Sequence, residues 1–164
     1  MTIPPPLRLR CEYLINPLGI DTLRPRFSWV LRHAERGAKP AAYEVIVSSR
    51  ASLAGRGIGD CWDSGRVDSD RTSQVEYDGP QPKSRTRYYW RVRRWDSQGR
   101  RSADSRPAFF EMGLLSRADW QAKWISLKRP REFRSQGTTL QGKYRGEYVQ
   151  TWAIYLEKEF RTKP

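Results

Sequence analysis

The stretch from Arg87 to Asp96 reads RYYWRVRRWD, and its pattern is the strongest indication of the fold class. Its apolar side chains recur at every second position, which is the repeat of a β-strand whose successive side chains point to opposite faces. One face would carry Tyr88, Trp90 and Val92, and the other would mix arginines with aromatic residues. Ser97-Gln98-Gly99 closes the stretch as a turn. We predict the longest strand of the fold here, with one face in the core.

The same period of two recurs on both sides of this strand. Further strands are predicted at 7–13, 27–31, 42–47, 62–67, 74–77 and 107–114, between turn signals such as Asn16-Pro17-Leu18-Gly19 and Asp78-Gly79-Pro80. No helix is expected among them, and Gly55 to Gly59 is interpreted as a loop. About seven short strands without intervening helices predict an all-β, antiparallel sandwich of the immunoglobulin or fibronectin type III kind. Trp29 on the second strand and Tyr88 at the start of the penultimate strand fit its core and its tyrosine corner.

The remaining chain is predicted to be organised differently. The sandwich would span 1–115, followed by a linker over 116–147 and, from 148 to 164, the start of a second β domain that the chain end cuts short. Within the linker, Ser116 is positioned to cap one helical turn, Lys123 to Leu127 form a short extended segment, and 128–147, which have little apolar content, form a loop or linker. The apolar residues that indicate the second domain are Trp152, Ile154, Leu156 and Phe160.

The chain is strongly basic, with a formal net charge of +13 over 164 residues. The arginines are spread along the sequence, and their densest stretch, Arg85 to Arg106, alternates with aromatic residues as a strand face does. We therefore favour a solvated strand face over a specific nucleic-acid site, because charge alone carries no sequence readout. No apolar run is long enough to span a membrane, and Met1 to Pro6 lacks the apolar core of a signal peptide, so the expected location is the cytoplasm.

Motifs that carry chemistry are not recognisable. Cys11 and Cys61 fit no zinc spacing, and we favour two buried free thiols over a disulfide between them. The single histidine, His33, lies in a polar run and is interpreted as a solvated loop residue rather than a triad member. Aspartates such as Asp63 and Asp96 lie in turns, where they commonly cap the backbone. We expect no catalytic residues, no cofactor and no metal.

Two tryptophans give the one hint of a binding surface. Trp62 and Trp95 fall out of phase with the expected core residues, so we interpret them as exposed. A flat indole face stacks on sugar rings or packs against another domain, and we favour the domain interface because large exposed apolar patches usually mark interfaces.

Several segments together resemble the opening of bacterial α-L-rhamnosidases, over residues 7–125. The resemblance rests on Asn16 to Asp21, Pro25 to Trp29, Ala42 to Ser49, Trp62 to Val67, Tyr88 to Asp96, Phe110 to Leu115, Asp119-Trp120 and Lys123 to Ile125. The sequence departs from the family at Ser102-Ala103-Asp104-Ser105, where Trp-Ser is common, and at Glu157, where arginine is common.

The resemblance implies an N-terminal fibronectin type III-like sandwich of a multidomain glycoside hydrolase. In that family a later (α/α)6 barrel removes terminal α-L-rhamnose with inversion, through carboxylates that activate water. This chain would then be non-catalytic and would serve a structural or docking role toward other domains of the same polypeptide. The alternatives are a module that binds rhamnose-containing glycosides and, less favoured, a domain that binds polyanions through charge.

Overall fold

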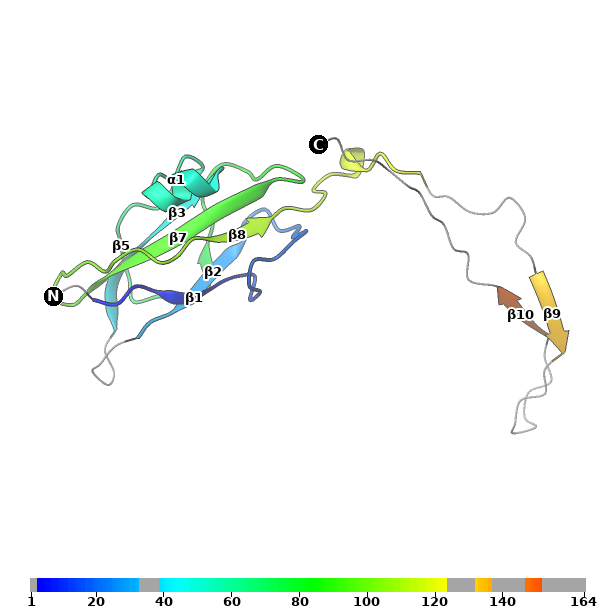
Figure 1. The fold of residues 1–164 in the computed structure, drawn as a ribbon, viewed down its shortest axis with the longest axis horizontal. Coiled ribbons are helices and arrows are strands. Elements are labelled where there is room, and N and C mark those ends of the chain that lie inside the picture. The colour runs from blue at the N-terminus through cyan, green and yellow to red at the C-terminus, as the bar shows by residue number, and fades with distance from the viewer. Residues whose placement is uncertain (1–2, 33–38, 124–131, 137–146, 152–164) are drawn as a thin grey trace. The chain divides into compact units, whose positions relative to one another are not determined.

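The computed structural model describes residues 3–32, 39–123, 132–136 and 147–151, which fall into two compact units, Met1–Trp120 and Gln121–Pro164. The first unit is a sandwich of two antiparallel sheets (Figure 1). One sheet has the order β1-β2-β6, with β1 (Leu7–Cys11), β2 (Arg26–Val30) and β6 (Val75–Glu76). The other has the order β4-β3-β7-β8 with β5 also paired to β3; it contains β3 (Pro40–Ser48), β4 (Trp62–Asp63), β5 (Val67–Asp68), β7 (Arg87–Asp96) and β8 (Ala108–Glu111). The predicted all-β sandwich is confirmed.

The core lies between the two sheets, and β7 supplies its centre. Tyr88, Trp90 and Val92 are buried, whereas the alternate residues of this strand keep some exposure, as the period of two predicts. Trp90 packs on Phe27 of β2 with ring centroids 4.4 Å apart, so the aromatic residues join the two sheets directly. Burial of such large rings supplies most of the driving force for a domain of this size.

A tyrosine corner fixes the entry into β7. The hydroxyl of Tyr88 accepts a hydrogen bond of 2.9 Å from the backbone N–H of Lys83, five residues upstream. This contact ties the connection before β7 to the core strand and confirms the interpretation of Tyr88.

One helix interrupts the expected run of strands, so the prediction of no helix is wrong. Residues Ala51–Arg56 form α1, and Gly57 ends it in the left-handed conformation with φ of 77°. Gly55 to Gly59 is therefore partly helix and partly its cap, rather than only a loop. A helix of six residues is too short to produce a recognisable 3.6-residue pattern, because it buries only Ala54.

The predicted strand at 62–67 is split into β4 and β5 by a bulge. Ile46 pairs with Asp63 and Ala42 pairs with Asp68, so one extra residue is accommodated between the two pairs. Inside the bulge, the Ser64 hydroxyl accepts the backbone N–H of Val45 at 2.9 Å and so replaces a ladder bond.

The C-terminal part agrees with the prediction at one point and differs at another. Ser116 caps the 3-10 turn η1 (Arg117–Asp119) through its hydroxyl, and Asp119 bonds back to the Ser116 backbone, which confirms the predicted cap. In the second unit, β9 (Glu132–Gln136) pairs with β10 (Glu147–Thr151), so the loop predicted over 128–147 contains a strand.

Some predictions concern residues outside the described part of the chain. These are the solvated loop at His33, most of the extended segment Lys123 to Leu127, and the apolar residues Trp152 to Phe160. In the part that is described, no helix is long and apolar enough to cross a membrane.

Candidate functional site

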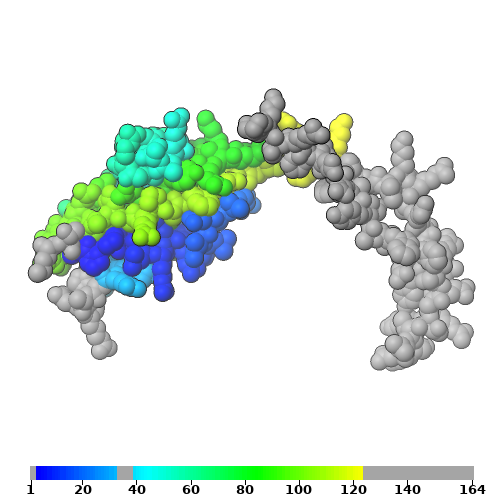
Figure 2. Space-filling view, in the orientation of Figure 1, coloured from blue at the N-terminus to red at the C-terminus, as the bar shows by residue number. Residues whose placement is uncertain are grey.

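The outer face of the larger sheet carries the densest group of charged side chains. This face is formed by the residues of β3 and β7 that point away from the core, because cross-strand partners share a face: Glu44 lies opposite Arg93 and Ile46 lies opposite Arg91. Helix α1 covers part of the face, and Figures 1 and 2 show it on the side of β3 and β7 away from β1. Arg91 donates to the carbonyl oxygens of Ala54 and Gly55 at 2.8 and 2.9 Å, which anchors the helix.

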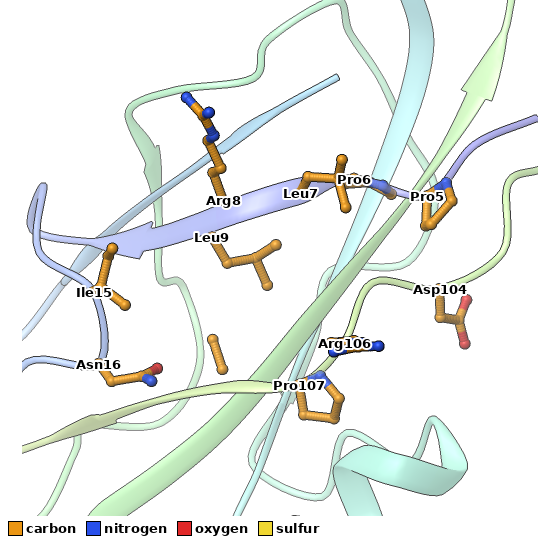
Figure 3. A pocket seen from close by; sticks show the side chains of 11 residues that line it. Pro5, Pro6, Leu7, Arg8, Leu9, Ile15, Asn16, Asp104, Arg106 and Pro107 are labelled. Carbon is orange, nitrogen blue, oxygen red and sulfur yellow. The ribbon is translucent and has the colours of Figure 1, made fainter. Parts of the chain in front are cut away.

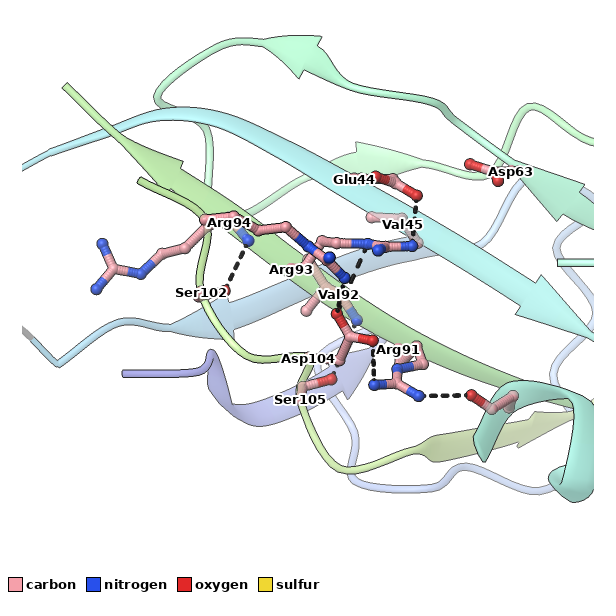
Figure 4. Close-up of polar contacts among 12 residues, drawn as sticks. Glu44, Val45, Asp63, Arg91, Val92, Arg93, Arg94, Ser102, Asp104 and Ser105 are labelled. Atoms are coloured by element: carbon pink, nitrogen blue, oxygen red, sulfur yellow. Dashed lines mark hydrogen bonds and ion pairs between the residues drawn. The ribbon is translucent and has the colours of Figure 1, made fainter. Parts of the chain in front are cut away.

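Asp104 is the hub of an ion-pair network on this face (Figure 4). It pairs with Arg91, with Arg101 at 3.2 Å and with Arg93 at 3.7 Å. Arg93 also donates to Glu44 at 2.7 Å, so one guanidinium joins both carboxylates. Arg91, Arg93, Glu44 and Asp104 expose only 12–17% of their side chains. The network is therefore partly withdrawn from water, where ion pairing is stronger than at an open surface.

The two carboxylates of this network, Glu44 and Asp104, differ from the catalytic pair of a glycosidase. Burial raises the pKa of Glu44, a shift that Arg93 opposes and the nearby Asp63 and Asp104 reinforce. A raised pKa is what a general acid needs. A glycosidase, however, leaves the space between its two carboxylates open for the sugar and water, whereas here Arg93 bridges them. The arrangement is that of a structural network that fixes α1 and the 101–107 segment on the sheet.

The two tryptophans singled out in the sequence lie on opposite faces of this sheet. Trp62 pairs with Val47 on the inner face and is half-buried there, packed against the core, with its ring centroid 5.3 Å from that of Tyr77 and 6.4 Å from that of Phe27. The interpretation that Trp62 lies out of phase with the core is therefore wrong. It failed because the bulge after Asp63 shifts the strand phase, which the sequence pattern does not reveal.

Trp95 lies on the outer face, as expected, but it is only half exposed. The Arg66 guanidinium lies 5.3 Å from its ring centroid in cation–π geometry, so one face of the indole is already occupied. The structure does not bring the two tryptophans together into one stacking platform.

The two cysteines of the sandwich do not form a reactive or metal-binding group. Cys11 and Cys61 are both free thiols; Cys11 is buried and Cys61 is half-buried rather than buried. Burial raises the pKa of Cys11 to about 12 and that of Cys61 above its ordinary value, so both are protonated at neutral pH and unreactive. Within the described ranges, no group of three or more His, Cys, Asp or Glu residues is placed to hold a metal ion.

Sequence reasoning missed the most connected residue of the site. In the sequence, Asp104 stands out only as part of a Ser-Ala-Asp-Ser segment that departs from the family, yet in the structure it pairs with three arginines. The alternating arginines of β7 were a usable signal, because a half-buried strand face with Arg91 and Arg93 requires a carboxylate nearby.

Comparison with known proteins gives a consistent result. Residues 6–116 match the family model described as Rha78A-like, N-terminal immunoglobulin domain. An α-L-rhamnosidase of Streptomyces avermitilis is 47% identical over 119 residues, which are 73% of this chain but 11% of that protein.

Solved structures agree with this match. The α-L-rhamnosidase structure from Dictyoglumus thermophilum superposes with a TM-score of 0.76 at 41% identity, over 82% of this chain and 15% of that one. The Streptomyces avermitilis α-L-rhamnosidase, solved with L-rhamnose, superposes with a TM-score of 0.70 at 43% identity, over 74% and 12%. The chain thus spans a small fraction of the length of the proteins that it matches.

Proposed function

The chain belongs to the family of Rha78A-like N-terminal immunoglobulin domains, and from this we propose that it is a non-catalytic module with a structural, domain-docking role in an α-L-rhamnosidase. The observation that carries the proposal is the extent of the match. The sandwich accounts for nearly all of the similarity, while 85% or more of each matched rhamnosidase has no counterpart in this chain. The rest of such a protein would contain the machinery that hydrolyses terminal α-L-rhamnose.

The side chains of the sandwich support a structural rather than a catalytic role. Arg93 pairs with both Glu44 and Asp104, and burial raises the pKa of both Cys11 and Cys61. We expect the purified chain to release no p-nitrophenol from p-nitrophenyl α-L-rhamnoside. Release above the rate of a heat-denatured control would contradict the proposal.

The docking role is tested by transplantation. The 119 matched residues of the Streptomyces avermitilis enzyme are either deleted or replaced by the matching residues of this chain, which gives a deletion variant and a chimera. A docked domain stabilises what it contacts, so the deletion variant should lose rhamnosidase activity at a lower temperature than the chimera. Equal inactivation temperatures would contradict a docking role.

Sugar binding is the alternative function. Trp62 packs half-buried against the core on the inner face of the sheet and Trp95 stacks with Arg66 on the outer face, which argues against a shared sugar-stacking platform. We therefore expect calorimetric titration of the chain with L-rhamnose to give no binding heat. Heat that disappears in Trp95→Ala would favour a carbohydrate-binding module instead.

We also propose a cytoplasmic location. Support comes from the two free cysteines, which are typical of a reducing compartment. Fractionation of producing cells tests it, and recovery of the protein outside the cytoplasmic fraction would contradict it.

A further inference from the structure

Exposed apolar side chains gather in the connection between β1 and β2. Leu14, Ile15 and Leu18 expose 58%, 66% and 66% of their surface, and we call these three residues the apolar ridge. Single exposed apolar residues are normal on a protein surface, but several in one short segment indicate a contact surface.

A strained turn holds the start of the ridge. Glu12 and Tyr13 both have positive φ, 48° and 64°, although neither is glycine, and the backbone groups of Cys11 and Leu14 bond to each other at 3.0 Å across them. The side chain of Arg26 fixes this turn through two bonds to the Glu12 carboxylate, of 2.7 and 3.1 Å. Non-glycine residues adopt this conformation only where their surroundings enforce it, and such strain concentrates at functional sites.

The rest of the ridge is tied to β8. Asn16, also at positive φ, accepts the backbone N–H of Phe109 through its side-chain oxygen at 3.0 Å. The carbonyl of Pro17 accepts the N–H of Glu111, and the N–H of Ile20 donates to the carbonyl of Glu111, both at 3.0 Å. Leu18 is therefore presented by a backbone that is anchored on both sides.

A pocket of about 330 Å³ adjoins the ridge (Figure 3). Its wall is mostly apolar, with Leu9 and Ile15 contributed from the β1 side and Pro107 from the segment that precedes β8. Two exposed arginines, Arg8 and Arg106, also line it. Ile15 belongs to both features, so ridge and pocket form one continuous surface.

We propose that the apolar ridge and this pocket together form the surface on which a later domain of the same rhamnosidase polypeptide docks. This inference rests on the proposed function, because a domain that docks needs a contact surface, and it identifies that surface on the sandwich. A rigid, exposed apolar segment loses little conformational entropy when it is covered, which favours a permanent interface. The matched rhamnosidases supply the occupant, because this chain covers only 11–15% of them. The docking partner would present apolar side chains to the ridge and acidic ones to Arg8 and Arg106.

The chimera described above tests this surface. Leu14→Ser with Leu18→Ser removes two ridge residues, and Val30→Ser with Ile58→Ser is the matched control at two other exposed apolar positions. In the isolated chain, both double variants should unfold within about 2 °C of the unaltered protein, because exposed side chains contribute little to folding. In the chimera, the ridge variant should lose activity about 3–6 °C below the unaltered chimera, and the control should not.

Each outcome decides between defined alternatives. If ridge and control variants behave alike in the chimera while the deletion variant is less stable, the ridge is not the docking surface but the docking role stands. If the deletion variant is as stable as the chimera, the docking role itself fails. A ridge variant that is equally destabilised in the isolated chain would show that the ridge serves folding rather than docking.

Discussion

Tyr88 illustrates how a single hydroxyl determines the path of the chain. Its ring lies in the core, stacked on Phe110 with centroids 5.3 Å apart, while its hydroxyl satisfies the backbone N–H of Lys83. Removing the oxygen leaves the ring packing intact and leaves a half-buried donor without its acceptor.

We therefore expect Tyr88→Phe to lower the free energy of unfolding by about 1–2 kcal/mol in urea titrations of the chain. Tyr89→Phe is the control, because Tyr89 lies on the outer face beside Arg87. Removing the Tyr89 hydroxyl should lower the free energy of unfolding by less than about 0.5 kcal/mol. Equal effects of the two substitutions would contradict the importance of the corner.

The turn at Glu12 gives a pH-dependent prediction. The hydrogen bond from the Arg26 side chain lowers the pKa of Glu12 more than burial raises it. A carboxyl group whose pKa is lower in the folded than in the unfolded chain stabilises the fold at pH values above its unfolded-state pKa, which for Glu is about 4.3. This stabilisation is lost as the pH falls through the lower, folded-state pKa. Glu12→Gln should therefore melt below the unaltered chain at pH 7, and the difference in Tm should shrink as the medium is acidified below pH 4.

Asp21→Asn serves as the comparison for that measurement. Asp21 is an exposed carboxylate of the same β1–β2 connection. At pH 7 its substitution should change the Tm by less than Glu12→Gln does, because an exposed surface side chain contributes little to folding. A Glu12→Gln difference that did not change with pH would mean that the ion pair with Arg26 contributes nothing to the turn.

At the scale of the elements, β7 depends on two serines along part of its edge. Beyond the residues paired with β8, the backbone N–H groups of Val92 and Arg94 donate to the hydroxyls of Ser105 and Ser102, both at 3.0 Å. The N–H groups of these serines return bonds to the carbonyls of Val92 and Arg94 at 2.9 and 2.8 Å. The 101–107 segment thus supplies hydrogen-bond partners for the backbone of β7 at this edge, although it is not itself a β-strand.

Replacing these serines should destabilise the sandwich. Each of Ser102→Ala and Ser105→Ala leaves a buried backbone donor unpaired, so each should lower the free energy of unfolding by about 1–3 kcal/mol in urea. Ser97→Ala, in the exposed turn after β7, should change it by less than about 0.5 kcal/mol. Buried serines that proved as tolerant as Ser97 would refute this account of the strand edge.

The predictability of these elements follows from their burial pattern. The bounds of β7, Arg87–Asp96, follow from its alternating residues because both of its neighbours are strands and one face is fully buried. Helix α1 and the bulge at Ser64 escape the same reasoning, since they depend on tertiary contacts such as Arg91 with the helix carbonyls. Of the ridge residues, the sequence pattern marks only Leu18, as part of the Asn16-Pro17-Leu18-Gly19 turn, because exposure is a property of the folded chain.

For the molecule as a whole, part of the high positive charge is paired with carboxylates of the same domain. On the outer sheet face, Arg91, Arg93 and Arg101 share Glu44 and Asp104, so this part of the arginine-rich stretch is committed to internal pairs. The interface role of Trp95 and the domain boundaries at 115 and 147 stay predictions, because both concern contacts with other domains.

The central claim is that this sandwich works as a docked domain of a larger enzyme. Scanning calorimetry of the isolated chain and of the chimera tests it most directly, because docking couples the unfolding of neighbouring domains. We expect the sandwich to unfold at a higher temperature in the chimera than alone, together with the domain that it contacts. A separate sandwich transition at the same temperature as in the isolated chain would contradict it.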